Sequence, residues 1–365
     1  MTSASANRIA PRDDLRALSG YHSPQLDVRV RLNTNESPFL PPDAFVDEWL
    51  AALRDLSFHR YPDRAATDLR AALSQQLDQP AERIFCANGS NEVLQTLLLT
   101  YGGHGRDALV FEPTYALHAH IARITGTGVL EGERLPGYHI DPDAASALVR
   151  ERAPAIVFVC SPNNPTGTVE ARDTLEAIAT AAAEAGTLVV VDEAYGEFSH
   201  WSALDLIDDA HPIVVVRTYS KVWSMAALRL GFAVAPAWAV AELEKVVLPY
   251  SLPAPTQLAG VLALHHRDEM AQRVELLVEE RGRVATAVEA YDAIDVFPSG
   301  ANFVLLNLNG DGHALWEALL ARGVLVRDFS RWPRTENCLR VTIGTPEEND
   351  AFLAALDAAL AEVTA

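Results

Sequence analysis

The 365-residue chain has few cysteines and a deficit of basic side chains, and each shortage excludes a class of protein. Cys86, Cys160 and Cys338 are odd in number and far apart, so we expect neither a disulfide framework nor a cysteine metal cluster. Lysine and arginine total 29 against 49 acidic residues, which gives a formal charge of -20. Nucleic-acid binding requires basic side chains that neutralise phosphates, so no nucleic-acid partner is expected.

Long apolar runs are also missing. Residues 1–14 lack the apolar core of a signal peptide, and no uninterrupted apolar run reaches the ~20 residues that span a membrane. We therefore expect a cytoplasmic protein with no membrane partner. Apolar residues still make up 49% of the chain, which is typical of a folded protein, and its length favours two domains.

A metal site is not expected either, although the chain has 11 histidines. His118 with His120 has no cysteine or acidic residue nearby at ligand spacing, and no cysteine lies near His265 and His266. Helix surfaces are the more common place for such histidines.

Hydrophobic periodicity divides the chain into three parts. Residues 1–38 are predicted to form an irregular arm that packs with the small domain or a partner subunit. Residues 39–255 alternate short apolar runs with helical stretches, which indicates a large α/β domain with a mostly parallel sheet. Residues 256–365 begin with a long charged helical stretch and continue as strand, helix and strand, which predicts a small α+β domain. We expect the active site between the two domains.

Polar residues follow three of the predicted buried strands. Residues 156–160 lead into Ser-Pro-Asn-Asn-Pro-Thr-Gly, residues 187–191 into Asp-Glu-Ala-Tyr, and residues 213–216 into Arg-Thr-Tyr-Ser-Lys. The carboxyl ends of parallel strands meet at one edge of a sheet, where ligands bind. Each motif alone is common as a turn, a helix cap or a solvated lysine. Their ordered combination indicates a functional site.

The spacing of these motifs resembles the fold-type I aminotransferases, which depend on pyridoxal 5'-phosphate. Asp192 lies 28 residues after Asn164, Lys221 lies 29 residues after Asp192, and Arg229 follows eight residues later. The segments Leu-Asn-Thr-Asn-Glu-Ser-Pro at 32–38 and Arg-Tyr-Pro-Asp at 60–63 make the chain most similar to the histidinol-phosphate aminotransferases. The resemblance implies a seven-stranded, mostly parallel sheet in the large domain and a homodimer.

The resemblance also assigns the catalytic residues Lys221, Asp192 and Tyr195. Pyridoxal phosphate acts as an electron sink, so a lysine must bind its aldehyde and later move a proton, which Lys221 matches. A carboxylate beside the pyridine nitrogen keeps that nitrogen protonated, which Asp192 matches. Tyr195 and Asn164 match the donors that stabilise the phenolic oxygen of the cofactor ring.

The remaining cofactor contacts follow from the same resemblance. A phosphate dianion suits a helix N-terminus, hydroxyl groups and a guanidinium. Tyr115 matches an aromatic residue that stacks on the cofactor ring. Tyr61 matches a tyrosine that relatives extend to the cofactor phosphate of the partner subunit. The matching phosphate contacts are Gly89, Ser90, Thr218, Ser220 and Arg229.

Four residues match substrate-binding positions, namely Tyr21, Asn35, Arg327 and Arg340. An arginine fork suits a carboxylate or a phosphate, although Arg327 is alternatively a surface residue paired with Asp328. Two positions depart from the family pattern. Residues 222–228 read Val-Trp-Ser-Met-Ala-Ala-Leu where many relatives are rich in glycine, and His118 stands where many have a second tyrosine. His118 is therefore left out of the predicted site.

The expected reaction is a step of histidine biosynthesis. It transfers an amino group reversibly between L-histidinol phosphate, whose keto partner is imidazole acetol phosphate, and the glutamate/2-oxoglutarate pair. Three alternatives stay open: an aromatic amino-acid aminotransferase, a phosphate-ester amino-acid decarboxylase of the cobalamin type, and a non-catalytic cofactor-sensing domain. The last requires an appended DNA-binding segment, for which we expect no room before Tyr21. Pocket differences the size of a methylene discriminate by only about 1–3 kcal/mol, so the pattern does not choose between the substrates.

Overall fold

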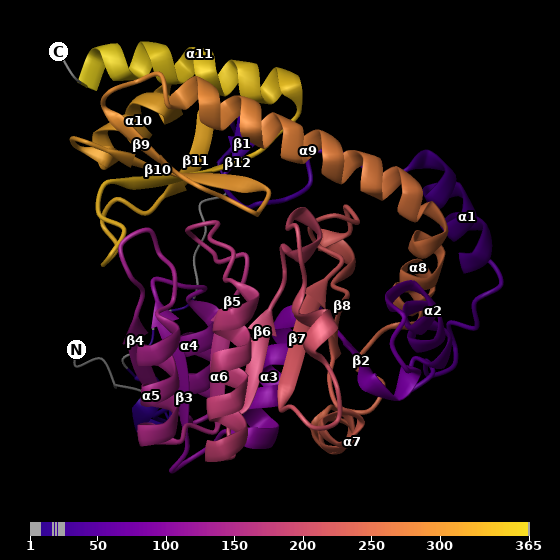
Figure 1. Ribbon diagram of the computed structural model, residues 1–365. Coiled ribbons are helices and arrows are strands. Elements are labelled where there is room, and N and C mark those ends of the chain that lie inside the picture. Colours follow the sequence, from indigo (N-terminus) through magenta and orange to yellow (C-terminus); the bar gives the residue numbers. More distant parts are fainter. Residues whose placement is uncertain (1–8, 17, 19, 21–25, 364–365) are drawn as a thin grey trace, which may run out of the picture.

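The computed structural model describes residues 9–16, 18, 20 and 26–363. They form two sheets with helices around them, and Figure 1 shows the smaller sheet above the larger one. The long helix α9 (Arg267–Val288) runs from the region of α8 (Ala254–Ala263) toward the smaller sheet (Figure 1). In the described part of the chain, no helix combines the length and apolar character needed to cross a membrane.

The larger sheet has seven strands in the order β2-β8-β7-β6-β5-β3-β4. Neighbours from β7 to β4 are parallel, whereas β8 runs antiparallel to both β7 and β2. The prediction of a mostly parallel seven-stranded sheet is confirmed. The strands are β2 (Ile84–Ala87), β3 (Asp107–Glu112), β4 (Gly128–Glu133), β5 (Ile156–Cys160), β6 (Leu188–Asp192), β7 (Ile213–Thr218) and β8 (Gly231–Val234).

The central strands are continuous apolar runs because helices cover both faces of the sheet. Every residue of β5, β6 and β7 is buried. By contrast, β4 lies at an edge of the sheet and is mostly exposed or half-buried, so its sequence is not a continuous apolar run. The helices of this part are α1 (Asp43–Leu53), α2 (Thr67–Leu77), α3 (Ser90–Tyr101), α4 (Leu117–Ile124), α5 (Pro142–Arg152), α6 (Arg172–Ala185) and α7 (Ala237–Val246).

Helix α2 begins at Thr67, four residues after Asp63. The Asp63 carboxylate accepts hydrogen bonds from the backbone N–H groups of Ala65, at 3.0 Å, and Thr67, at 2.7 Å. Ala66 has a left-handed backbone with φ of 48°. These local bonds form a turn that competes with a helix over residues 63–66.

The smaller sheet has five strands in the order β1-β11-β12-β10-β9. Its first strand comes from the N-terminal arm: β1 (Val30–Leu32) pairs in parallel with β11, from Val324 to Val326. The arm thus covers an edge of the C-terminal sheet that would otherwise expose unpaired backbone groups. The other elements are β9 (Ile294–Phe297), β10 (Phe303–Leu308), β11 (Val324–Asp328), β12 (Cys338–Thr342), α10 (Gly312–Ala321) and α11 (Pro346–Val363).

Candidate active site

A cavity of about 240 Å³ lies where β5, β6 and β7 end, and residues of the N-terminal arm and of β12 close it. Most of the predicted site residues meet there, although they come from distant parts of the chain. Those that line the cavity are Asn35, Ser90, Tyr115, Asn164, Asp192, Tyr195, Thr218, Ser220, Lys221, Arg229 and Arg340.

Lys221 follows β7, and its Nζ donates to the backbone oxygen of Thr34 at 3.2 Å. Burial lowers the pKa of the Lys221 amine to about 8, and the nearby positive charge of Arg340 adds to the effect. A lysine with this pKa is neutral in about a tenth of the molecules at pH 7, whereas an ordinary lysine is almost fully charged. The structure therefore provides a nucleophilic amine inside the cavity.

Asp192 is the last residue of β6, and it is 2% exposed. Its Oδ1 accepts from the backbone N–H of Ala194 at 3.0 Å, and its Oδ2 lies 2.9 Å from His118 Nε2. His118, which the predicted site leaves out, does not line the cavity but touches the predicted cofactor carboxylate. A signal was present in the sequence: His118 follows Tyr115 by three residues, so the two can share one face of a helical turn.

Tyr195 and Asn164 each keep a donor available for the cavity. The Tyr195 hydroxyl accepts from Asn35 Nδ2 at 2.9 Å, so its own hydrogen can serve another acceptor. Burial raises the pKa of Tyr195 to about 12, which keeps the phenol protonated. Arg340 Nη1 donates to Asn164 Oδ1, and this bond leaves the Asn164 NH₂ group to donate elsewhere.

Donors suited to a phosphate gather at the N-terminus of α3. Gly89 is the N-cap with φ of 81°, and a Cβ at this position would lie 2.6 Å from Arg229 Nη2, so only glycine lets the guanidinium come this close. Arg229 Nη1 lies 3.3 Å from Ser220 Oγ, and Thr218 Oγ1 lies 3.0 Å from the same atom. A helix start, two hydroxyls and a guanidinium form a ready anion site.

The segment 222–228, which departs from the family pattern, has an unusual backbone at Ser224. This residue takes the left-handed backbone that glycine would favour, with φ of 55°. Its Oγ donates to Ser37 Oγ at 2.9 Å, which joins the segment after Lys221 to the N-terminal arm. Trp223 is buried and stacks on Tyr219, with ring centroids 5.1 Å apart.

Arg327 does not line the cavity but lies next to a residue that does. It pairs with Arg340 across β11 and β12 and is 8% exposed, so it is not a surface residue. Asp328, its alternative partner, binds His313 Nδ1 at 2.8 Å. Both guanidinium groups approach the Phe329 ring, Arg327 at 5.9 Å and Arg340 at 5.4 Å from its centroid. Tyr21, the fourth predicted substrate residue, lies outside the described residues.

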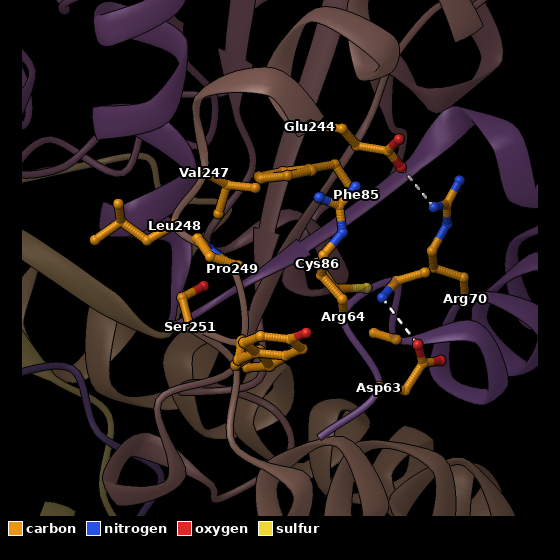
Figure 2. A pocket seen from close by; sticks show the side chains of 14 residues that line it. Asp63, Arg64, Arg70, Phe85, Cys86, Glu244, Val247, Leu248, Pro249 and Ser251 are labelled. Carbon is orange, nitrogen blue, oxygen red and sulfur yellow. Dashed lines mark hydrogen bonds and ion pairs between the residues drawn. The ribbon is translucent and has the colours of Figure 1, made fainter. Parts of the chain in front are cut away.

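Tyr61 is a further predicted residue that does not line the cavity. Its side chain is 81% exposed and stacks on Tyr250, with ring centroids 4.6 Å apart. Tyr250 also lines a separate pocket of about 60 Å³, together with Arg64, Arg70 and Glu244. Figure 2 shows the last three of these side chains. Arg70 Nη1 binds Glu244 Oε1 there at 2.8 Å, so these charges already neutralise each other. This pocket contains none of the predicted site residues.

No cluster of three or more histidine, cysteine, aspartate or glutamate side chains suited to a metal ion occurs within the described ranges.

Comparison with known proteins identifies the family. The family model described as aminotransferase class I and II matches residues 28–356. The chain belongs to this family. The aminotransferase is 46% identical over 355 residues to the histidinol-phosphate aminotransferase of Streptomyces avermitilis, and the match covers 94% of this chain and 95% of that protein.

Solved structures confirm the predicted fold-type I architecture. The histidinol-phosphate aminotransferase of Sinorhizobium meliloti in complex with pyridoxal-5'-phosphate matches with a TM-score of 0.88 at 21% identity, over 98% of this aminotransferase and 99% of that chain. The L-threonine-O-3-phosphate decarboxylase of Porphyromonas gingivalis matches with a TM-score of 0.78 at 22% identity, over 91% of this aminotransferase and 99% of that chain. Since both share the fold, the architecture does not choose between these reactions.

Proposed function

We propose that this aminotransferase carries out reversible amino transfer between L-histidinol phosphate and 2-oxoglutarate, using pyridoxal 5'-phosphate. The observation that carries the proposal is the pair Arg327 and Arg340, two buried guanidinium groups on neighbouring strands beside the cavity of Lys221 and Asp192. The names of the relatives at 40–46% identity support the same substrate.

The residues of the cavity fit the cofactor in charge and in donor type. Its phosphate would bind at the start of α3 with Thr218, Ser220 and Arg229, where the glycine at position 89 leaves room for the guanidinium. Asp192 would face the pyridine nitrogen. Tyr115 would stack on the ring. When bound, the cofactor supplies an electron sink for the carbon that carries the amino group.

Three side chains of the cavity would handle charge and protons. Lys221 would bind the cofactor covalently and then carry the proton at its Nζ, which the carbonyl oxygen of Thr34 holds in place. Tyr195 and Asn164 would donate to the phenolic oxygen of the ring, because Asn35 and Arg340 occupy their acceptor atoms. The arm residues 33–36 line the cavity and would limit the entry of water.

The two arginines would distinguish the two substrates. Glutamate offers carboxylates, and one planar fork at Arg340 suits a carboxylate. Histidinol phosphate offers a dianionic phosphate instead, and a second guanidinium at Arg327 adds charge-assisted hydrogen bonds to it. Arg327 would therefore favour the phosphorylated donor.

Arg327→Gln is expected to lower kcat/KM for histidinol phosphate by about 10- to 100-fold, because a hydrogen bond to a charged group contributes about 1.5–3 kcal/mol. With phenylalanine as donor the loss should stay below about threefold, since phenylalanine has no phosphate for Arg327 to bind. Steady-state kinetics with both donors on the same enzyme preparations measures this difference.

Arg331→Gln is the matched control, because Arg331 is an exposed arginine four residues away and should change neither value. Equal losses for the two donors in Arg327→Gln would remove Arg327 as the phosphate-binding residue. They would favour an aromatic amino-acid aminotransferase instead.

A homodimer with shared sites is part of the proposal. The segments that carry Tyr61 and Tyr250 expose apolar side chains: Phe58 is 69% exposed, Tyr61 81% and Leu248 75%. The stacking of Tyr61 on Tyr250 holds these two segments together. Exposed apolar groups of this kind mark protein contacts, and a partner subunit at this surface would place Tyr61 at the neighbouring cofactor phosphate.

Mixing inactive Tyr61→Ala with inactive Lys221→Ala is expected to restore about a quarter of the wild-type activity. Random exchange makes about half of the dimers mixed, and each mixed dimer has one site with both residues intact. Activity after subunit exchange, with exchange verified by differently tagged chains, measures this recovery.

A mixture of Lys221→Ala with Asp192→Ala serves as the control and should stay inactive, because both residues line the cavity of the same chain. If verified exchange restored nothing in the Tyr61 mixture, Tyr61 would not act across the interface.

A further inference from the structure

Two buried arginines of the smaller sheet share one aromatic ring. Arg327 on β11 and Arg340 on β12 are 8% and 6% exposed, and they lie directly opposite each other in the antiparallel pair. Like charges in that position repel each other, and burial removes the water that would screen them. Both guanidinium groups approach the Phe329 ring, with Cζ atoms 5.9 Å and 5.4 Å from its centroid. These distances lie within the range of a cation–π contact.

Strand geometry places Phe329 for this contact. The residue follows Arg327 by two positions, so the two side chains lie on one face of the sheet, because side chains alternate along an extended chain. The backbone N–H of Phe329 donates to the carbonyl oxygen of Cys338 at 3.1 Å, which continues the pairing of β11 with β12 beyond Asp328. The ring is 8% exposed, and Trp332 packs edge to face against it at 5.3 Å. The ring therefore has a fixed place beside both charges.

Arg340 also has other contacts. The Phe303 ring lies 5.2 Å from its guanidinium, Nη2 donates to the carbonyl oxygen of Asn33 at 2.8 Å, and Nη1 donates to Asn164 Oδ1. These partners would remain without the Phe329 ring, so Arg340 would still be held where it can bind a carboxylate. The Phe329 ring, by contrast, contacts both guanidinium groups at once.

We propose that Phe329 is a positioning residue that determines the preference of the site for a phosphate. Its ring attracts both guanidinium groups and holds them side by side against their mutual repulsion, so that a dianion can bind both. A carboxylate carries a single charge and suits the fork of Arg340 alone. Phe329 acts through the two arginines and does not line the cavity itself. The inference rests on the proposed function, because it explains the selectivity for the phosphorylated donor.

The first test compares substrates. Phe329→Leu keeps an apolar side chain but removes the aromatic face, whereas Phe329→Tyr keeps that face. In Phe329→Leu we expect KM for histidinol phosphate to rise about 3- to 30-fold, the range that one cation–π contact supplies. The value of kcat should stay within twofold, because the phosphate is bound equally before and during the reaction. KM for glutamate should change less than threefold, and Phe329→Tyr should restore both KM values.

The second test changes the charge distribution of the ring and keeps its shape nearly constant. Phenylalanine analogues with one, two and three ring fluorines are incorporated at position 329, because each fluorine withdraws electron density from the ring face and weakens its attraction for a cation. Calorimetry on the holoenzyme measures Kd for phenyl phosphate and for benzoate, which carry different anionic groups on the same ring. We expect Kd for phenyl phosphate to rise with each fluorine, by about 3- to 10-fold in all, and Kd for benzoate to stay within twofold.

Phe297→Leu is the matched control, since Phe297 packs against the same apolar cluster but its ring contacts Tyr138, and it should leave the ratio of the two KM values unchanged. Equal changes for histidinol phosphate and glutamate in Phe329→Leu would overturn the inference. So would a Kd for phenyl phosphate that does not respond to the fluorines, or that is no lower than Kd for benzoate in the unaltered enzyme. If Phe329→Leu does not fold, the fluorinated series decides the question. Unaltered enzyme that binds phenyl phosphate but does not turn over histidinol phosphate would instead overturn the proposed function.

Discussion

Lys221→Ala is expected to lose the lysine-linked chromophore of the purified enzyme and at least about 10,000-fold in kcat, the scale seen when a residue central to covalent catalysis is removed. Under the proposed function one amine has two tasks, covalent attachment of the cofactor and movement of the proton. The buried position that lowers the pKa of Lys221 to about 8 suits both tasks. Absorbance spectra and single-turnover kinetics measure the loss.

The chain makes this test unusually sharp because it contains only two lysines, Lys221 and Lys245. Lys245 is an exposed residue of α7 paired with Glu242, so Lys245→Ala is a matched control that should keep full activity. Borohydride reduction of the unaltered enzyme, followed by peptide mapping, should find the cofactor on Lys221. Cofactor found on Lys245, or at the N-terminus, would overturn the assignment of the site.

Asp192→Ala is expected to retain some cofactor but to lower kcat by roughly 100- to 10,000-fold. Removing one partner of a buried ion pair costs about 3–5 kcal/mol, and an unprotonated pyridine withdraws electrons poorly. Asp192→Asn separates charge from shape, since the amide has nearly the same size as the carboxylate. It should lose almost as much kcat as the alanine variant.

Cofactor content from absorbance, measured beside single-turnover rates, distinguishes weak cofactor binding from slow chemistry in both Asp192 variants. Turnover close to that of the unaltered enzyme in Asp192→Asn would show that the negative charge of residue 192 is not required, and it would remove the role proposed for this carboxylate.

Much of the fold and the site could be predicted because the signals are local. The apolar runs at 156–160, 187–191 and 213–216 indicate buried parallel strands, which the structure has as β5, β6 and β7. The polar residues that follow such strands must gather at one edge of the sheet. Asp192 and Lys221 therefore line one cavity, as their positions after neighbouring strands predicted.

Contacts between distant segments could not be predicted in this way. His118 stacks on Phe158 of β5 and lies beside Asp192, which is 74 residues away in the sequence. A periodicity argument assigns a histidine to a helix but cannot say which face of the helix meets which strand end.

From the sequence alone we predicted the family, the order of the strands along the chain and the chemistry proposed for the residues at their ends, because these depend on residue types at short spacing. The way in which the two ends of the chain complete the cavity depends on the tertiary fold. Asn35 of the arm binds Thr342 of β12 across 307 residues, and Arg340 reaches the carbonyl oxygen of Asn33 at 2.8 Å. These contacts exist because β1 adds to the edge of the C-terminal sheet, and such a pairing depends on the packing of the whole chain.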